Sequence, residues 1–224
     1  MTNASSFAFP FDLVGFDLDG TMVDSTQDIA AAVNHALSLI DRPPLTTEQV
    51  DRIVGGGSLH LLKQALQATG GMDGLDIDAL LAEQLAYYEA HIAVHTRPLD
   101  GLIACLDQLD QLGIRYAVAT NKIERLARLL LGELGLLDRM AFIIGGDTLG
   151  FDRAKPAPDM LLAMMAETSA QRTAFVGDTI YDVKAAAAAD CTSIIIAANE
   201  DGLRLGADHN ITHFDQLIPL LKTL

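Results

Sequence analysis

Two periodicities of hydrophobic residues divide the chain. Between Thr26 and Val94, apolar positions recur at the spacing of amphipathic helices, and no stretch alternates as a half-buried strand would. From Gly101 onward, short apolar runs alternate with helical patterns. The first part therefore predicts a block of helices, and the second part predicts strands and helices in alternation.

Prolines and glycines divide the helical block into four helices. The segments Arg42-Pro43-Pro44, Gly55-Gly56-Gly57 and Gly70-Gly71 interrupt the periodic pattern, because proline cannot continue a helix and glycine favours turns. Thr47 and Ser58 are candidate N-caps. The expected helices span residues 26–40, 47–54, 58–68 and 78–94.

The rest of the chain predicts a parallel sheet with helices on both faces. The expected strands span residues 13–16, 114–119, 141–144, 173–176 and 192–196. The expected helices span residues 102–112, 124–134, 158–167, 181–189 and 214–221, and the last contains Pro219. Apolar strands that alternate with helices are typical of an α/β fold with a doubly wound, Rossmann-like parallel sheet.

The change of pattern also predicts two domains. Residues 1–24 and 96–224 would form the core, and residues 25–95 would form an inserted, all-helical cap. The insert leaves the sheet after its first strand and returns before the second. In sheets of this kind the binding site lies beyond the carboxyl ends of the strands, so the cap is expected to cover it.

Polar residues follow several strands directly, and they would meet at one edge of the sheet. They are Asp17, Asp19, Thr120, Asn121 and Asp178. Lys155 would reach the same edge from a proline-flanked loop that lies after another strand and just before a helix. Gly20 allows a sharp turn that brings the first two carboxylates together. Like charges at that spacing raise each other's pKa unless a cation lies between them. The pattern indicates a divalent metal beside one nucleophilic carboxylate and one acid/base carboxylate.

The same residues are suited to phosphoryl transfer. Asp17 is positioned as the nucleophile and a metal ligand, and Asp19 would protonate the leaving oxygen and later deprotonate water. The Thr120 hydroxyl would hold a phosphoryl oxygen, and Lys155 would supply a positive charge. Asp178 would complete the oxygen ligands that Mg²⁺ prefers.

These residues resemble the motifs of the haloacid dehalogenase superfamily of phosphohydrolases. The matches are Asp17-x-Asp19-Gly20-Thr21-x-x-Asp24, Thr120, Lys155 and Gly177-Asp178-x-x-x-Asp182, in the family's order. The resemblance implies a Mg²⁺ ion held by Asp17, the backbone carbonyl of Asp19 and Asp178. Asp182 would support the metal waters or Lys155, and the resemblance does not rank it firmly against Asp178. Gly20, Thr21 and Asn121 are expected to bind substrate.

Differences among branches of this superfamily separate the possible reactions. Dehalogenases and phosphonate-cleaving relatives lack the carboxylate found here at Asp19, so its presence favours a phosphatase. Mutases of the superfamily carry a histidine where this chain has Ile29, and His35 is interpreted as a partly exposed helix residue. The sequence therefore favours hydrolysis, with a phosphomutase as a weaker alternative.

Among the phosphatases, the chain looks most like bacterial phosphoglycolate phosphatases. The matching segments span residues 16–25, 119–122, 145–150, 155–159 and 176–178. In the cap, Gly56, Gly57 and Ser58 resemble a substrate-facing loop, and a plain turn is the alternative. The segment Ala197-Ala198-Asn199-Glu200 replaces an aromatic, glycine-containing segment of that family. The expected substrate is 2-phosphoglycolate, with a sugar phosphate or amino-sugar phosphate as the alternative.

Composition limits the partners. The chain is 50% hydrophobic and 20% charged, which fits a globular protein, and its formal net charge of −15 disfavours nucleic acid and anionic membranes. It has no Trp, no apparent signal peptide and no apolar run long enough to span a bilayer. Cys105 and Cys191 lack metal-ligand spacing. We therefore expect a cytoplasmic monomer or homodimer that acts on a small phosphorylated metabolite.

Receiver domains of signalling proteins share part of this pattern. They also place clustered aspartates, a threonine and a lysine on a doubly wound sheet. However, they need no inserted cap, and their phosphate acceptor lies later in the chain than the first strand. The sequence therefore favours an enzyme over a receiver-like phospho-acceptor.

Overall fold

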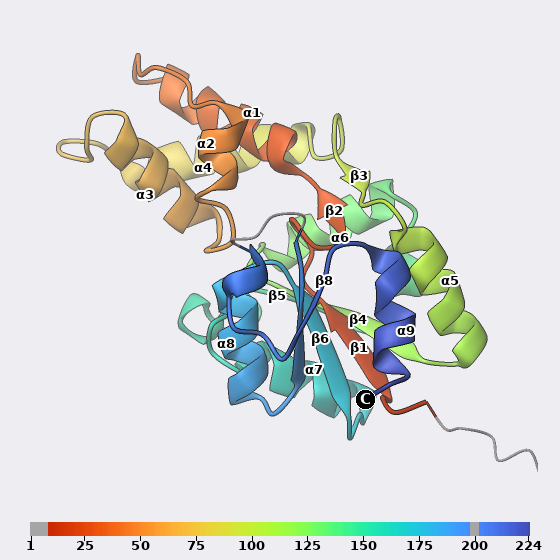
Figure 1. The fold of residues 1–224 in the computed structure, drawn as a ribbon. Helices are drawn as coiled ribbons and strands as arrows, with labels where there is room; N and C mark the ends of the chain where they lie inside the picture. Colours follow the sequence, from red (N-terminus) through yellow and green to blue (C-terminus); the bar gives the residue numbers. More distant parts are fainter. Residues whose placement is uncertain (1–8, 198–201) are drawn as a thin grey trace, which may run out of the picture.

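A six-stranded parallel sheet forms the centre of the molecule, of which the computed structural model describes residues 9–197 and 202–224 (Figure 1). The spatial order of the strands is β5-β4-β1-β6-β7-β8, and every neighbouring pair is parallel. The strands are β1 (Leu13–Phe16), β4 (Arg115–Thr120), β5 (Ile143–Gly145), β6 (Thr173–Gly177), β7 (Thr192–Ile196) and β8 (His209–Ile211). The expected doubly wound parallel sheet is confirmed.

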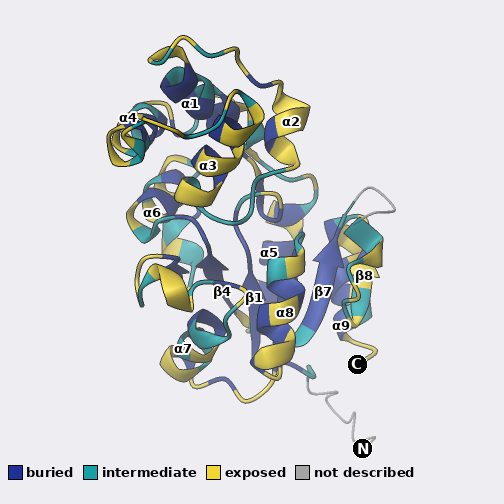
Figure 2. Cartoon of the chain, turned by 90° about the vertical axis from the view of Figure 1, so that its left-hand side faces the viewer, coloured by how far each residue is buried: buried dark blue, intermediate teal, exposed yellow. Residues whose placement is uncertain are grey.

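Helices cover both faces of the sheet, so its central strands β1 and β6 are buried on both sides (Figure 2). Side chains alternate along a strand, so Leu13 and Phe16 of β1 join different apolar clusters. One cluster includes residues of α7 (Asp159–Thr168) and α8 (Ile180–Ala188). The other includes residues of α5 (Leu102–Leu112), α6 (Glu124–Glu133) and α9 (Leu217–Leu221).

Some elements differ from the expected pattern. Strands β4 and β6 each run one residue further, because Thr120 still pairs with β5 and Gly177 still pairs with β7. The C-terminal helix is divided into a 3₁₀ turn (Phe214–Gln216) and α9, and Pro219 lies in the first turn of α9, where its missing N–H is not needed. Further 3₁₀ turns lie at Leu137–Arg139, Phe151–Arg153 and Gly202–Arg204.

Four helices, here named the cap, stand above the carboxyl ends of the strands (Figure 1). They are α1 (Thr26–Ser38), α2 (Thr47–Asp51), α3 (Ser58–Ala68) and α4 (Ile77–Ala90), and α1 packs against the other three. The N-cap of α2 is Thr46, whose hydroxyl accepts from the Gln49 N–H in a capping box. The expectation that Thr47 caps this helix is therefore wrong.

The two segments that connect the cap to the sheet lie side by side. Strand β2 (Val23–Asp24) pairs antiparallel with β3 (Arg97–Pro98), and both are too short to show a sequence pattern. The buried Asp28 carboxylate, in the first turn of α1, accepts hydrogen bonds from the backbone N–H groups of His95 and Thr96 and from the Thr96 hydroxyl, at 2.7–3.1 Å. Asp28 thus fastens the returning segment to the outgoing one.

Two further points concern the described residues. None of their helices is long and apolar enough to cross a membrane. Three residues of the segment that departs from the family pattern, Ala198, Asn199 and Glu200, lie outside the described part of the chain.

Candidate active site

Asp17 lies directly after β1, at the edge of the sheet below the cap. Its N–H donates to the Val176 carbonyl on β6 at 2.9 Å, and its Oδ1 accepts from the Leu18 N–H at 2.7 Å. Burial raises the pKa of Asp17 to about 6; the charge of Asp182 adds to the rise, and Lys155 opposes it. A buried carboxylate with a raised pKa beside a specific charge partner is typical of a functional site.

Lys155 lies between two carboxylates. Its Nζ is 3.0 Å from Asp17 Oδ1 and 2.6 Å from Asp182 Oδ1, and its side chain is 1% exposed. Burial opposes the charge, but the carboxylates of Asp17 and Asp182 raise the pKa of Lys155 above its usual value. The amine therefore stays protonated, and it holds a fixed positive charge beside the Asp17 carboxylate.

Three carboxylates gather at this edge of the sheet. Asp17, Asp178 and Asp182 each offer one ligand atom, and these atoms lie within 4.8 Å of one another. Burial raises the pKa of Asp178 well above its usual value, and the charges of Asp182 and Asp17 raise it further. A cation would relieve this repulsion, and hard divalent ions prefer oxygen ligands. The donor set therefore fits a divalent metal ion.

The carboxylates of Asp178 and Asp182 differ in how many hydrogen bonds from the protein they already accept. Asp182 Oδ2 accepts from the Thr179 N–H and hydroxyl at 2.9 and 2.6 Å, and Oδ1 holds Lys155. Asp178 accepts one short bond, 2.7 Å long, from the Thr21 hydroxyl. Asp178 therefore keeps more acceptor capacity for a metal than Asp182 does.

Two glycines allow the chain to come this close to the carboxylates. Gly20 has a φ of 82°, and a Cβ there would collide with the Asp178 carboxylate. A Cβ at Gly177 would collide with the Asp182 side chain. Both positions therefore leave no room for a side chain, and Gly20 also requires glycine for its positive φ.

Asp19 points away from the carboxylate cluster, toward Ser25 and Lys122. Its carboxylate accepts from the Ser25 hydroxyl at 2.6 Å, and both of its oxygens lie 2.9 Å from Lys122 Nζ. Burial disfavours the charge of Lys122, but Asp19 raises the pKa of its amine. Lys122 is not among the site residues expected from the sequence. Its position in the matching segment 119–122, directly after Thr120 and Asn121, is the signal that could have found it.

Thr120 is the last residue of β4, and Asn121, which follows it, connects this strand to the cap. Thr120 Oγ1 accepts from the Lys122 N–H at 3.2 Å, so its proton remains available to donate. The Asn121 amide donates to the Gly55 carbonyl at 2.8 Å and to the Lys155 carbonyl at 2.9 Å. Asn121 therefore ties a cap loop and the Lys155 loop to the end of β4.

The glycine loop of the cap faces the core at the start of α3. Gly57, with a φ of 85°, is the N-cap of this helix, and Ser58 is its first residue. The expectation that Ser58 is the N-cap is therefore wrong. Gly55, Gly57 and Ser58 line the same pocket as Asp17, whereas Gly56 lines a neighbouring groove beside His60.

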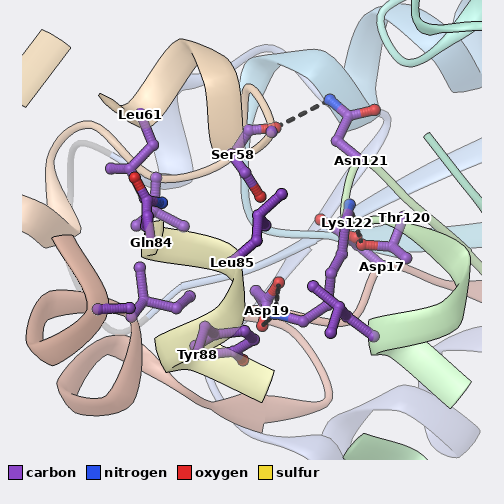
Figure 3. Close-up of a pocket in the computed structure, with 16 residues that line it drawn as sticks. Asp17, Asp19, Ser58, Leu61, Gln84, Leu85, Tyr88, Thr120, Asn121 and Lys122 are labelled. Carbon is purple, nitrogen blue, oxygen red and sulfur yellow. Dashed lines mark hydrogen bonds and ion pairs between the residues drawn. The ribbon is translucent and has the colours of Figure 1, made fainter. Parts of the chain in front are cut away.

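Core and cap together enclose a pocket above Asp17 (Figure 3). Its core side is lined by Asp17, Asp19, Thr120, Asn121, Lys122 and Leu126. Its cap side is lined by Ile29, Ala32, Val54, Gly55, Gly57, Ser58, Leu61, Gln84, Leu85 and Tyr88. The pocket is not lined by Lys155, Asp178, Asp182 or Thr21. Lys155 is paired with Asp17, Asp178 and Asp182 belong to the carboxylate cluster, and the Thr21 hydroxyl donates to Asp178.

The family model and the similar proteins that match this chain agree on one family. Residues 14–196 match the haloacid dehalogenase-like hydrolase family. The chain is 39% identical over 203 residues to the phosphoglycolate phosphatase of Pseudomonas putida, covering 88% of this chain and 71% of that protein. It is 36% identical over 195 residues to the phosphoglycolate phosphatase of Xylella fastidiosa, covering 87% and 83%.

Solved structures show the same fold. The crystal structure described as a predicted phosphoglycolate phosphatase from Haemophilus somnus matches with a TM-score of 0.86 at 24% identity, covering 94% of this chain and 97% of that one. The sequence matches extend over most of the chain, including the segments that carry Asp17, Thr120, Lys155 and Asp178. The chain therefore belongs to the haloacid dehalogenase-like hydrolase family, and it is a phosphatase.

Proposed function

We propose that the protein is a Mg²⁺-dependent phosphomonoester hydrolase that forms an aspartyl-phosphate on Asp17, with 2-phosphoglycolate as its substrate. The observation that carries this proposal is the buried Asp17 carboxylate, paired with Lys155 and open to the pocket that Asp19 also lines. The relatives named above support the choice of substrate.

The first step is attack by Asp17 on phosphorus. Asp17 Oδ1 is held by the Leu18 N–H and by Lys155, which leaves Oδ2 for attack. As the new O–P bond forms, the bond between phosphorus and the ester oxygen breaks, and Asp19 gives that oxygen a proton. The Thr120 hydroxyl and the charge of Lys155 stabilise the phosphoryl oxygens.

The second step returns the enzyme to its starting state. Asp19, which has given up its proton in the first step, takes a proton from water as that water attacks the phosphorus of the aspartyl-phosphate. Ser25 and Lys122 hold its carboxylate in place. The bond between phosphorus and Asp17 breaks, and inorganic phosphate leaves. The same residue thus serves as acid and then as base.

Asp17, Asp178 and the backbone carbonyl of Asp19 would hold the Mg²⁺ ion. When bound, the ion neutralises negative charge on the carboxylates and the phosphate. Asp182 has its oxygens occupied by Lys155 and Thr179, so we assign it to positioning Lys155.

Two observations bear on the alternatives. Ile29 lines the pocket where a superfamily mutase would need a histidine, which favours hydrolysis over phosphoryl relocation. Ser58, Gln84 and Tyr88 give the cap side of the pocket hydroxyl and amide groups, which are suited to sugar hydroxyls. A sugar phosphate or amino-sugar phosphate is therefore the second candidate substrate.

Mg²⁺ is expected to stabilise the folded protein, because it relieves repulsion among the three carboxylates. At about 100 times its dissociation constant, it should raise the free energy of unfolding by about 2.7 kcal/mol. Thermal unfolding followed by circular dichroism should then show an increase in Tm of about 5–10 °C. Asp178→Asn should remove this increase, and Asp190→Asn, at an exposed position just beyond α8, should retain it. An equal increase in Asp178→Asn would contradict the assigned metal site.

Replacement of the nucleophile tests the reaction itself. Asp17→Asn keeps the shape of the side chain but removes the attacking carboxylate, so kcat should fall by about a thousandfold or more. Phosphate release would be measured with Mg²⁺ on 2-phosphoglycolate, sugar phosphates and pyrophosphate, with the exposed Asp73→Asn as the matched control. Retained activity in Asp17→Asn would refute the nucleophile. Preference for a sugar phosphate would refute only the substrate.

The acid/base role of Asp19 predicts a dependence on the leaving group. Asp19→Asn should lower kcat for 2-phosphoglycolate by about 10²- to 10⁴-fold, because its alkoxide needs a proton. With p-nitrophenyl phosphate the leaving group needs no proton, so stopped-flow absorbance should show a burst of p-nitrophenolate followed by slow turnover. Absence of the burst, with equal losses on both substrates, would be inconsistent with this role.

A further inference from the structure

Unpartnered polar atoms are concentrated at the pocket. Among the described residues, four buried side-chain atoms have no hydrogen-bond partner: Gln84 Oε1, Tyr88 OH, Asn121 Oδ1 and Thr173 Oγ1. The first three belong to residues that line the pocket above Asp17. Buried polar groups in folded proteins are nearly always paired, because an unpaired group loses its hydration without compensation. Three such atoms around one cavity therefore point to a ligand that pairs with them.

Gln84 and Tyr88 lie on one face of α4, because residues four apart in a helix are one turn apart. They are 4% and 5% exposed. Lys122 Nζ lies 4.4 Å from the centroid of the Tyr88 ring, and the same amine is paired with Asp19. Tyr88 therefore lies near the proposed acid/base, and Figure 3 shows Gln84 beside Leu61 on the cap side of the same pocket.

The surroundings of these two side chains are otherwise largely apolar. The remaining cap side chains that line the pocket are those of Ile29, Ala32, Val54, Ser58, Leu61 and Leu85. None of the cap residues that line it is charged. A few neutral polar groups in an apolar wall are typical of a site that fixes the orientation of a small ligand.

A structural amide in the same cap behaves differently from Gln84. The Asn34 side chain donates to the Leu45 carbonyl at 2.9 Å and accepts from the Leu45 N–H at 2.8 Å, so both ends of this amide hold the chain. Gln84 Oε1 makes no such bond within the described residues. Burial raises the pKa of Tyr88 to about 12, although the nearby Lys122 ammonium, which interacts with the hydroxyl, lowers it. The hydroxyl keeps its proton at neutral pH and can donate a hydrogen bond to a ligand.

We propose that Gln84 and Tyr88 are specificity residues that bind oxygen atoms on the leaving group of the phosphate ester. An amide and a hydroxyl each donate and accept hydrogen bonds, so the pair suits a carboxylate or a hydroxyl on that group. The inference rests on the proposed function, in which the phosphoryl group is held by Asp17, Thr120 and Lys155. The carboxylate of 2-phosphoglycolate and the hydroxyls of a sugar phosphate share this chemistry.

A series of small phosphate esters tests the proposal. Ethyl phosphate lacks an oxygen on its leaving group beyond the ester oxygen, 2-hydroxyethyl phosphate adds a hydroxyl, 2-phosphoglycolate adds a carboxylate, and glucose 6-phosphate adds a sugar. The wild-type enzyme should prefer an oxygen-bearing ester to ethyl phosphate. A preference for 2-phosphoglycolate would show that the pair binds a carboxylate. A preference for 2-hydroxyethyl phosphate or glucose 6-phosphate would show that it binds a hydroxyl.

Gln84→Met and Tyr88→Phe remove the polar atoms and nearly preserve volume. Each should lower kcat/KM for the preferred oxygen-bearing ester by about 10- to 100-fold, mainly through KM. In Gln84→Met, kcat/KM for ethyl phosphate should change by less than about twofold, because ethyl phosphate makes none of these bonds and, among the described residues, Gln84 has no hydrogen bond to Lys122 or Asp19. Inhibition by inorganic phosphate, which contacts only the core, should be unchanged.

Two matched variants serve as controls. Tyr87→Phe alters the neighbouring tyrosine, whose ring stacks with His35 and His91 at centroid distances of 4.5 and 4.2 Å. Gln67→Met alters an exposed glutamine on α3. Neither should change the preference among esters. Because Gln84 Oε1 has no protein partner, Gln84→Met should also keep the Tm of the wild-type protein.

Three results would overturn the proposal. A preference for the oxygen-bearing ester that is unchanged in both Gln84→Met and Tyr88→Phe would show that these residues do not bind the leaving group. Equal losses on every ester, together with a lower Tm, would show a structural role. Absence of hydrolysis by the wild-type protein would overturn the proposed function and this inference with it. Hydrolysis that needs Asp17 but neither cap residue would overturn this inference alone.

Discussion

The buried ion pair of Lys155 with Asp17 and Asp182 is the interaction on which the rest of the site depends. The three side chains are 1%, 7% and 2% exposed, so removing one partner would leave an uncompensated charge in the interior. Each partner is held by a different part of the fold: the end of β1, the N-terminus of α8, and the loop whose carbonyl Asn121 binds. The parallel sheet brings these distant segments to one edge.

The molecule separates the chemistry from the choice of substrate. In the proposed function, charged groups on the core would meet the phosphoryl group, and the neutral groups that line the cap side of the pocket would face the remainder of the substrate. Asn121 connects the two parts, because its amide bonds to the Gly55 carbonyl of the cap loop and to the Lys155 carbonyl of the core. A change in the cap wall can therefore alter specificity while the ion pair below Asp17 stays intact.

The sequence predicted the sheet and its polar strand ends because each rests on a local pattern. Asp17, Thr120 and Asp178 directly follow apolar strands, and parallel strands end at one edge. Lys122 was missed because a polar residue before a helix has an ordinary capping interpretation. Strand β8 was not predicted, because two of its three residues, His209 and Asn210, are polar and it shows no apolar run. Gln84 and Tyr88 carry no motif, and only the three-dimensional contacts reveal that Gln84 Oε1 and the Tyr88 hydroxyl lack hydrogen-bond partners among the described residues.

The central claim is that Asp17 becomes phosphorylated during turnover. Borohydride reduces an acyl phosphate to an alcohol, so a phosphorylated Asp17 would be converted to homoserine. Mass spectrometry of the peptide that contains residue 17, after quenching a reaction with 2-phosphoglycolate and Mg²⁺, measures this directly. The account predicts homoserine at position 17 only when substrate is present. Homoserine at another aspartate, or none during active turnover, would contradict it.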